Sequence, residues 1–502
     1  MAQVAACCAK IGLCAAAVCF AFAAAAPASQ AAPQLNVSPS GHYICYGDEV
    51  LLLAGDSGTQ CVLQNLNLDY RQWLDDCASR RIRAVHVWSF LAPRQKQDGS
   101  VVEPRYGYVY PGVTPWARRR GGPPAADGLP QWDLTRFDEG REPKKHYWPR
   151  LRDLCAFAQA RGIIVGITVF FGWPKHNTPA RPDWTFHPFN ELNGGFLHED
   201  KPIVTACQTI AEPGREVLAE EWSESWPAAK KTQWVWERFA DKLIRETQRF
   251  GNVFFVFMDE HSYPEGNCGE HFLRFFKRRG ALWVDWERRR REVDFVMTET
   301  FSAEDKNARA VSAFYKRPPR PVLHLEGGPY LGDGARKAMW TFLIGGGHYF
   351  YHDDAGQETM RTGIQGYDPH VPGGDKGMQR RDWLGYASRF FNEGLARLDA
   401  MVPHNELVLG GKGYCLAAPG AQYAVYSPEG ETIALDLSAA RGARAEVQFY
   451  DPRTGRWRAP LRITVPREGR VELAKPDGRD WALRITVAAG SAAHAPAMEE
   501  RA

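Results

Sequence analysis

The stretch that decides the fold is Asn252-Val-Phe-Phe-Val-Phe-Met-Asp-Glu-His261, an unbroken apolar and aromatic run that ends in two carboxylates and a histidine. A β-strand covered by helices on both faces has this pattern, because neither face meets water and no polar residues alternate along it. In α/β barrels, chemistry is carried at the carboxyl ends of such strands. We therefore expect Asp259 and Glu260 to lie on the functional face of a parallel barrel.

A second stretch has the same organisation. Pro321-Val-Leu-His-Leu-Glu-Gly-Gly328 places Glu326 at the end of another short apolar run. Our central hypothesis is that Glu260 and Glu326 face one another across one active site. Glu299, which also follows an apolar run, and Asp259 are the rival candidates for these two roles.

Similar runs recur along the chain, with helical patterns between them. The predicted strands are 49–55, 82–90, 162–171, 252–258, 293–297, 321–326 and 348–354. The predicted helices are 68–80, 147–161, 229–249, 271–279, 303–315, 335–343 and 380–397. This alternation predicts βα units with right-handed crossovers and a parallel sheet. An eighth strand is only weakly signalled, by Ala281-Leu-Trp-Val-Asp285, and with it residues 36–400 would form a (β/α)8 TIM barrel.

Two long segments without a regular pattern, 92–145 and 172–228, follow predicted strands and so fall on the face where a barrel builds its site. Polar and aromatic residues also gather at or just after the strand ends. We predict that they contact a substrate, with packing as the alternative for each. These residues are Asp56, His86, Trp88, Trp173, His176, Asp259, Tyr263, Glu299, Tyr351 and His352.

The histidines and glycines of the barrel do not predict a metal or a cofactor. His324, His348 and His352 lack a fixed ligand spacing, and His324 and His348 lie within predicted strands. The run 345–347 of three glycines lacks the context of a phosphate-binding loop, and a backbone turn into the last strand explains it more simply.

The pattern changes after the barrel. Residues 403–488 form short alternating runs that turn residues separate, which predicts a small C-terminal antiparallel β-sandwich. Residues 489–502 are rich in Ala, Gly and charge, and we expect a disordered tail there.

The first residues read as a targeting segment. Residues 1–32 combine Lys10, an Ala-rich apolar core and small residues that offer cleavage sites, so we predict a signal peptide. An N-terminal membrane anchor is the alternative. Cleavage would give a secreted or periplasmic protein without membrane insertion.

Cysteine usage fits this expectation. The segment 1–32 holds four of the 11 cysteines, and the others show no metal-ligand spacing. The cysteines outside this segment are odd in number, and in an exported protein this predicts one or two disulfides and at least one free thiol. Pairing of Cys45 with Cys61 or Cys77 stays open. The remaining cysteines are Cys45, Cys61, Cys77, Cys155, Cys207, Cys268 and Cys415.

Composition narrows the class of partner. The chain is 44% hydrophobic and 24% charged, as expected of a globular protein, and its net charge of +3 gives no electrostatic case for a nucleic-acid partner. The 17 Trp and 18 Tyr residues serve mostly in packing, but they also suit stacking on the apolar faces of sugars in an oligo- or polysaccharide.

Two carboxylates at opposing strand ends suit the cleavage of glycosidic bonds. One protonates the leaving oxygen, and the other attacks the anomeric carbon or activates water. We assign Glu260 as acid/base and Glu326 as nucleophile of a retaining mechanism. The alternatives are a non-catalytic carbohydrate-binding or surface protein on a degenerate TIM barrel, and a metal-dependent hydrolase.

These residues resemble a known pattern. Asp259-Glu260 after strand four and Glu326 after strand seven resemble the acid/base and nucleophile positions of the clan A glycoside hydrolases. In that clan the residue before the acid/base is usually an Asn that contacts the sugar 2-hydroxyl, and Asp259 departs from it.

The closer resemblance is to the apiosidase-like glycosidases with an appended "putative collagen-binding" domain, and it covers residues 36–488. The matching barrel motifs are Gly55-Asp56-Ser57, the run from Asn252 to Glu260, and Arg320-Pro-Val-Leu-His-Leu-Glu326. The C-terminal motifs are Phe449-Tyr-Asp-Pro-Arg-Thr-Gly455 and Pro476-Asp-Gly-Arg-Asp-Trp481. In that family the acid after strand four is often the Asp of Gly-Gly-Asp, from which Met258-Asp-Glu260 differs.

Overall fold

The computed structural model describes residues 33–488, apart from 58–61, 65, 67–68, 91–112, 171–183, 201–209, 259–267, 287–288, 299–301, 328–331 and 352–373, and apart from the side chains of 374–378. The described chain belongs to one compact unit, Pro33–Ala502. The predicted signal peptide, 1–32, and the predicted tail, 489–502, lie outside the described residues.

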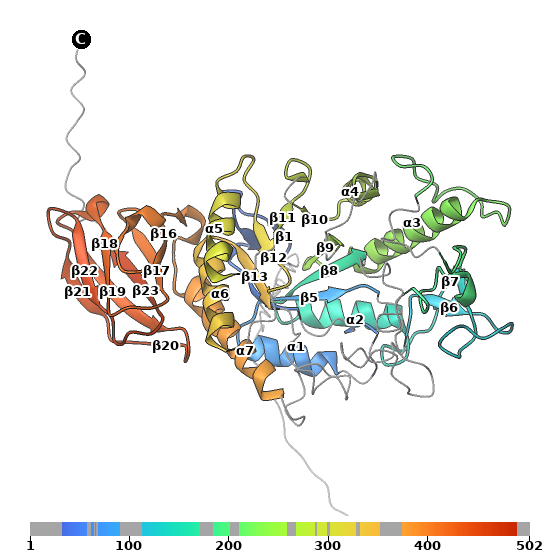
Figure 1. The fold of residues 1–502 in the computed structure, drawn as a ribbon, viewed down its shortest axis with the longest axis horizontal. Helices are drawn as coiled ribbons and strands as arrows, with labels where there is room; N and C mark the ends of the chain where they lie inside the picture. The colour runs from blue at the N-terminus through green and yellow to red at the C-terminus, as the bar shows by residue number, and fades with distance from the viewer. Residues whose placement is uncertain are drawn as a thin grey trace, which may run out of the picture. The chain divides into compact units, whose positions relative to one another are not determined.

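Eight parallel strands close into a barrel, in the order β10-β11-β12-β13-β4-β5-β8-β9 (Figure 1). This confirms the (β/α)8 prediction, including the weakly signalled strand, because β10 pairs with both β9 and β11. Along the chain, β9 is the fourth barrel strand and β12 the seventh. The strands are β4 (Ala54–Asp56), β5 (Ala84–Trp88), β8 (Ile164–Phe170), β9 (Val253–Met258), β10 (Trp283–Trp286), β11 (Phe295–Met297), β12 (Val322–His324) and β13 (His348–Tyr351).

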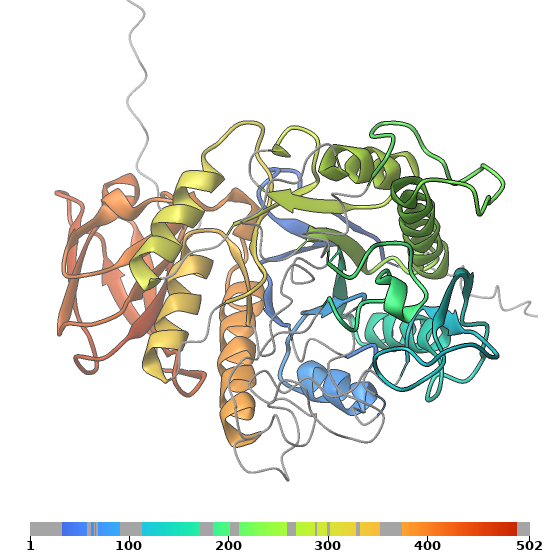
Figure 2. The ribbon, with the colours of Figure 1, turned by 45° about the vertical axis from the view of Figure 1, so that its right-hand side comes forward.

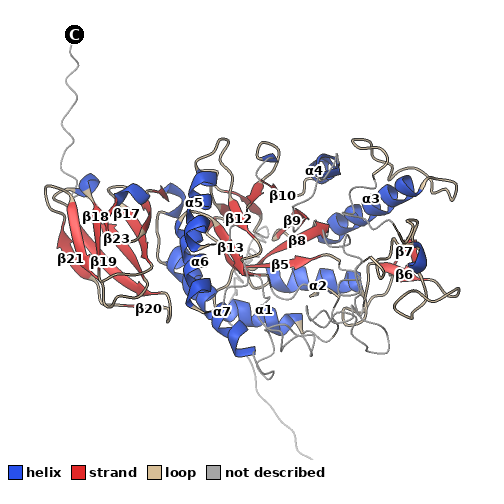
Figure 3. Ribbon diagram, in the orientation of Figure 1, coloured by secondary structure: helices blue, strands red, loops and turns tan. Residues whose placement is uncertain are grey.

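Helices surround these strands (Figure 3). Helix α1 begins where the Asp69 side chain accepts hydrogen bonds from two backbone N–H groups, and the Ser302 side chain caps α5 by accepting one from the Asp305 N–H. The helices are α1 (Tyr70–Ser79), α2 (Tyr147–Gln159), α3 (Ala228–Thr247), α4 (Cys268–Arg278), α5 (Ala303–Phe314), α6 (Asp333–Ile344) and α7 (Gly374–Ser388), which continues into the π-helical η7 (Arg389–Glu393). Short 3-10 turns are η3 (Glu191–Asn193), η8 (Leu398–Ala400), η9 (Asn405–Leu407) and η10 (Ser438–Ala440).

Large rings fill the barrel interior, and glycines make room for them. A Cβ atom on Gly55 would lie 2.4 Å from the Phe350 ring, and one on Gly166 would lie 2.5 Å from the Phe254 ring. Each Phe therefore occupies space that a side chain on the adjacent strand would otherwise fill.

The predicted first strand, 49–55, is split between two sheets, which corrects the sequence prediction. Its first part, β3 (Glu49–Leu51), pairs antiparallel with β2 (Ile44–Tyr46), which pairs with β1 (Leu35–Val37), whereas its second part is β4 of the barrel. Between them, the backbone N–H of Leu52 donates to the Asn392 side chain at 2.9 Å, and the Leu52 carbonyl accepts from the same amide at 3.1 Å.

The sheet β1–β2–β3 closes the amino-terminal end of the barrel. Leu35, Ile44 and Leu51 join one hydrophobic cluster with residues of the barrel interior such as Phe254. The backbone N–H of Leu35 also donates to the carbonyl of Gly251, just before β9, at 2.8 Å.

The segment 92–145, predicted to be irregular, contains an antiparallel pair, β6 (Trp116–Arg118) and β7 (Trp132–Phe137). This hairpin lies beside α2 and α3 (Figure 2). The Phe137 ring packs edge-on against Trp148 of α2, and Arg238 of α3 donates to the Thr135 carbonyl at 2.6 Å.

The C-terminal domain is antiparallel throughout, as predicted, and its two sheets enclose a separate hydrophobic cluster. One sheet contains β14 (Val402–Pro403), β16 (Tyr414–Ala418), β17 (Gln422–Ser427), β23 (Trp481–Val487), β19 (Arg444–Asp451), β20 (Arg456–Trp457) and β21 (Leu461–Thr464). The other contains β15 (Val408–Gly410), β18 (Thr432–Asp436) and β22 (Arg470–Ala474).

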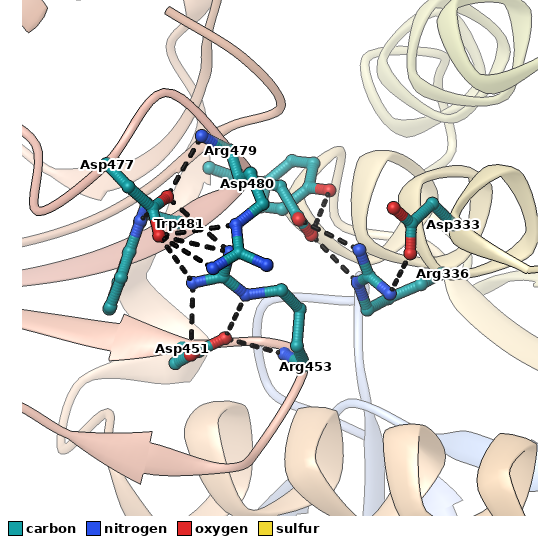
Figure 4. Close-up of polar contacts among 9 residues, drawn as sticks. Asp333, Arg336, Asp451, Arg453, Asp477, Arg479, Asp480 and Trp481 are labelled. Carbon is teal, nitrogen blue, oxygen red and sulfur yellow. Dashed lines mark hydrogen bonds and ion pairs between the residues drawn. The ribbon is translucent and has the colours of Figure 1, made fainter. Parts of the chain in front are cut away.

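The barrel and the β domain share a buried interface. Trp340 of α6 stacks on Tyr426 with ring centroids 5.6 Å apart, and the barrel's main hydrophobic cluster extends into the β domain. Arg336 of α6, only 2% exposed, donates two hydrogen bonds of 2.9 Å to Asp480. Figure 4 shows this pair beside a second set of contacts, in which Arg453 lies between Asp451 and Asp477. The two C-terminal motifs therefore supply the Arg453 contacts within the domain and the Asp480 contact to α6.

Among the described cysteines, Cys268 is disulfide-bonded, and Cys45, Cys77, Cys155 and Cys415 are free. This excludes both pairings of Cys45 that the sequence left open. Within the described helices, none is long and apolar enough to cross a bilayer.

Candidate active site

Five predicted site residues fall within the described chain: Asp56, His86, Trp88, Glu326 and Tyr351. The others lie outside the described residues, namely Trp173, His176, Asp259, Glu260, Tyr263, Glu299 and His352.

Glu326 follows β12 and is half-buried. The backbone on either side of it is held by neighbouring strands. The Gly327 N–H donates to the Phe350 carbonyl of β13 at 2.8 Å, and the Leu325 carbonyl accepts from Ser57 Oγ, just after β4, at 2.7 Å. Position 327 has no room for a side chain, because a Cβ atom there would lie 2.3 Å from the Tyr349 ring. The fold thus fixes Glu326 at the carboxyl end of the barrel.

His86 is 1% exposed and lies between two hydroxyl groups. Its Nδ1 is 3.3 Å from Ser57 Oγ, and its Nε2 is 2.6 Å from Thr168 Oγ1. The Ser57 hydroxyl donates its hydrogen to the Leu325 carbonyl. Its oxygen can therefore accept a hydrogen bond from His86 Nδ1–H. In that tautomer of a neutral ring, His86 Nε2 accepts a hydrogen bond from the Thr168 hydroxyl. A buried hydrogen-bonded chain therefore runs from β8 through His86 to the backbone beside Glu326.

Ser57 and Thr168 were missed as site residues. The available signal for Thr168 was a single hydroxyl near the end of the otherwise apolar run 164–170, and for Ser57 its place directly after the first strand. Trp88 packs in the same region, with its ring 4.5 Å from that of His86.

Asp56 and Tyr351 are directed toward the surrounding helices. Asp56 accepts from the indole N–H of Trp73 at 2.9 Å and lies 3.7 Å from the Arg381 guanidinium. The Arg380 guanidinium lies 5.0 Å from the Tyr351 ring centroid. The structure thus brings His86 and Trp88 together and links His86 to the backbone beside Glu326. It uses the side chains of Asp56 and Tyr351 in packing, and their contact with a substrate stays a prediction.

Among the described residues, no group of three or more His, Cys, Asp and Glu side chains could hold a metal ion. Two barrel histidines have structural partners instead. The buried Lys306 ammonium donates to His324 Nε2 at 2.7 Å, and the Leu53 N–H donates to His348 Nδ1 at 2.9 Å.

Comparisons with known proteins match the C-terminal domain to a sequence family and most of the chain to solved structures. Residues 402–486 match the family described as "Putative collagen-binding domain of a collagenase". No curated protein sequence matches the chain. A structure titled "Glycoside hydrolase" is 14% identical with a TM-score of 0.59, over 90% of this chain and 97% of that one.

Two structures from Bacteroides vulgatus are also similar. A glycoside hydrolase of family 5 is 14% identical with a TM-score of 0.60, covering 90% of this chain and 93% of that one. A "putative glycoside hydrolase" is 13% identical with a TM-score of 0.61, covering 91% and 83%. At such identities the likeness establishes the fold. The chain therefore has a TIM-barrel fold similar to that of these glycoside hydrolases, followed by a β domain that matches the collagen-binding family model.

Proposed function

We propose that the protein is an exported, retaining glycoside hydrolase that acts on an oligo- or polysaccharide, with Glu260 as acid/base and Glu326 as nucleophile. The observation that carries the proposal is the order of the closed barrel, in which β9 is the fourth strand and β12 the seventh. Glu260 follows β9 by two residues, and Glu326 follows β12 by two. This is the arrangement that the clan A resemblance implies, whereas the narrower apiosidase-like resemblance stays a prediction.

In this mechanism Glu326 attacks the anomeric carbon while Glu260 protonates the leaving oxygen, which forms a covalent glycosyl-enzyme. Glu260 then takes a proton from water, and that water displaces Glu326 with net retention. The two carboxyl groups should be about 5–5.5 Å apart, since an inverting site needs room for a water between them.

The contacts around Glu326 support its role as the nucleophile. A nucleophile must hold its position while the anomeric carbon moves toward it, and hydrogen bonds at Leu325 and Gly327 restrain the backbone on both sides. The His86–Ser57 chain fixes one of these restraints and acts as a positioning element.

The first test replaces each carboxylate by its amide. Glu326→Gln and Glu260→Gln should each lower kcat by about 10²–10⁴-fold on an aryl glycoside that the parent hydrolyses. The amide at 326 cannot attack the anomeric carbon, and the amide at 260 cannot transfer a proton. The matched control is Glu270→Gln, an exposed residue of α4, which should keep parental activity and unfolding temperature. Normal turnover in either site variant would reject its assigned role.

The product configuration tests retention. NMR of the first-formed anomer should show the configuration of the substrate, and an inverted product would exclude the nucleophilic role of Glu326. If the parent binds glycans but cleaves none of a broad panel, the non-catalytic alternative is favoured. Export is tested by the N-terminal sequence of the protein recovered outside the cytoplasm, which should start close to residue 33.

A further inference from the structure

A cavity of about 700 Å³ lies among the segments that follow β5 and β8. Its lining residues precede both Glu260 and Glu326 in the sequence. Its walls come from the β6–β7 hairpin, from the turn around η3, and from the chain that enters α3. We call it the rim pocket and define it by Arg119, Asp133, Glu191, Phe196, Trp222 and Trp226.

One wall of the rim pocket is aromatic. The Trp222 ring centroid is 5.4 Å from that of Phe196 and 5.7 Å from that of Trp226, and all three side chains are half-buried. Trp234 of α3 supports Trp222 from behind at 4.9 Å. The ammonium groups of Lys230 and Lys231 lie 4.6 Å from the Trp226 ring centroid and 5.6 Å from that of Trp222, respectively. The ring surface that borders the cavity beside them has a fixed orientation, which suits the flat C–H face of a sugar ring.

The lining of the rim pocket also offers charged hydrogen-bonding groups. Asp133 Oδ1 accepts from the backbone and hydroxyl of Thr135. The charge of Arg238 acts on this carboxylate, without an ion pair between the two side chains in the described chain. Among the described residues, Arg119 donates hydrogen bonds to two neutral oxygens, Gln131 Oε1 at 3.4 Å and the Gly194 carbonyl at 3.3 Å. Both groups keep hydrogen-bonding capacity for a ligand.

The charges of the pocket favour a neutral ligand. Lys231 pairs with Glu224 at 3.1 Å, and the Trp222 indole N–H donates to the same carboxylate at 3.0 Å, so these two charges offset each other. The other charged residues that line the pocket are one cation, Arg119, and two anions, Asp133 and Glu191. A field of mixed sign selects neither a polyanion nor a polycation, whereas neighbouring donors and acceptors match the hydroxyl groups of a sugar.

We propose that the rim pocket is a saccharide-binding subsite that holds part of a polymeric glycan. Both loops that build it begin at the carboxyl ends of barrel strands, as do the segments that carry Glu260 and Glu326. That the bound glycan is the substrate rests on the proposed function, but binding in the pocket requires no hydrolysis.

Binding can be measured on the full chain with Glu326→Gln as background, so that no ligand is consumed. The probes are soluble hexasaccharides of β-1,4-glucan, β-1,4-mannan, β-1,4-xylan and α-1,4-glucan, titrated calorimetrically. We expect binding of at least one, and a Kd that rises by about tenfold or more when Trp222→Ala and Trp226→Ala are added together. Asp133→Asn, which keeps the shape and the Thr135 contact, should also weaken binding.

The matched control is Leu192→Ala, because Leu192 is 43% exposed on η3 and does not line the pocket. It should leave the Kd unchanged, and thermal unfolding will show that the variants are folded. An unchanged Kd in both the Trp and the Asp133 variants, or no binding of any of the four hexasaccharides, would overturn the proposal.

Activity separates this proposal from the proposed function. On small aryl glycosides the Trp222/Trp226 variant should keep parental kcat/KM, whereas kcat/KM on the polymer should fall by about tenfold or more. If the Trp222/Trp226 variant and the parent have equal kcat/KM values on the polymer, the subsite is rejected while the proposed hydrolase activity stands. Hexasaccharide binding that depends on Trp222, in a protein that cleaves no glycoside, would reject the hydrolase while the subsite stands.

Discussion

Asp56 ends the first barrel strand with its carboxylate buried between α1 and α7, where it is 3% exposed. It accepts from Trp73 and lies beside Arg381. We predict that Asp56→Ala lowers the free energy of unfolding by about 1–3 kcal/mol, because it leaves the buried indole N–H without its acceptor. The measurement is denaturant unfolding together with KM on a small substrate. A raised KM at unchanged stability would instead support the substrate contact predicted from the sequence.

Two buried histidines give the protein a sensitivity to acid. Burial lowers the pKa of His187 and of His348 to about 3, and each Nδ1 accepts a hydrogen bond from a backbone N–H. Between about pH 3 and pH 6.5 the unfolded chain therefore binds protons that the folded chain excludes. The contribution of these two neutral rings to the free energy of unfolding is fully present above about pH 6.5. It falls as the pH drops, by about 1.4 kcal/mol per pH unit for each histidine.

The pH effect is checked by the unfolding temperature at pH 7.5 and at pH 5. In His348→Gln an amide oxygen can still accept from Leu53 N–H, but it does not titrate, so the drop in unfolding temperature should be smaller than in the parent. An equal drop would show that His348 does not contribute to the effect.

The position of Glu326 could be predicted from the sequence, because an apolar run followed by an acid is a local pattern. Its supporting contacts could not be predicted. Ser57 lies 29 residues from His86 and 268 residues from Leu325, and only barrel closure brings these strand ends together. Asp56 illustrates the same limit, since one residue of register decides whether a side chain faces the barrel interior or the helices.

At the scale of the element, Gly55 sets the fit between β4 and β13. We predict that Gly55→Ala lowers the free energy of unfolding by about 1–3 kcal/mol, because the new methyl group would overlap the Phe350 ring. Phe350→Leu removes the edge of that ring, so the double variant should recover part of the loss. A double-mutant cycle in denaturant measures the coupling, and strictly additive effects would show that the two sites do not meet.

The strands that the sequence predicted poorly have identifiable causes. In β10 the buried Asp285 pairs with Arg289 at 3.0 Å, so a carboxylate interrupts what would otherwise be an apolar run. The run 49–55 is uniform in sequence, and only the distant Asn392 shows where it changes sheet. The hairpin was missed although 132–137 alternates between buried and less buried residues.

At the scale of the whole molecule, the Arg336–Asp480 pair joins the barrel to the β domain. We predict that Asp480→Ala lowers the free energy of unfolding by about 1–3 kcal/mol, because it removes the buried partner of the Arg336 guanidinium and leaves the exposed Asp333 beside it. Glu472→Gln, at an exposed position of the same domain, is the matched control.

Calorimetry provides the readout for the pair. The parent should unfold in one transition, and Asp480→Ala should lower its midpoint, whereas Glu472→Gln should leave it in place. The double variant Arg336→Met/Asp480→Ala should recover part of the loss, because neither buried charge then remains. A parental midpoint in Asp480→Ala would refute the predicted role of the pair.

The shared hydrophobic cluster has a consequence for how this architecture can change during evolution. The sequence family begins at residue 402, but Trp340 and Phe390 on the barrel side pack on Tyr426 and Trp457 beyond that point. A gene truncated at the family boundary would encode a barrel with these rings facing water, and such a patch promotes aggregation. We therefore expect that loss or exchange of the β domain requires compensating substitutions on α6 and η7.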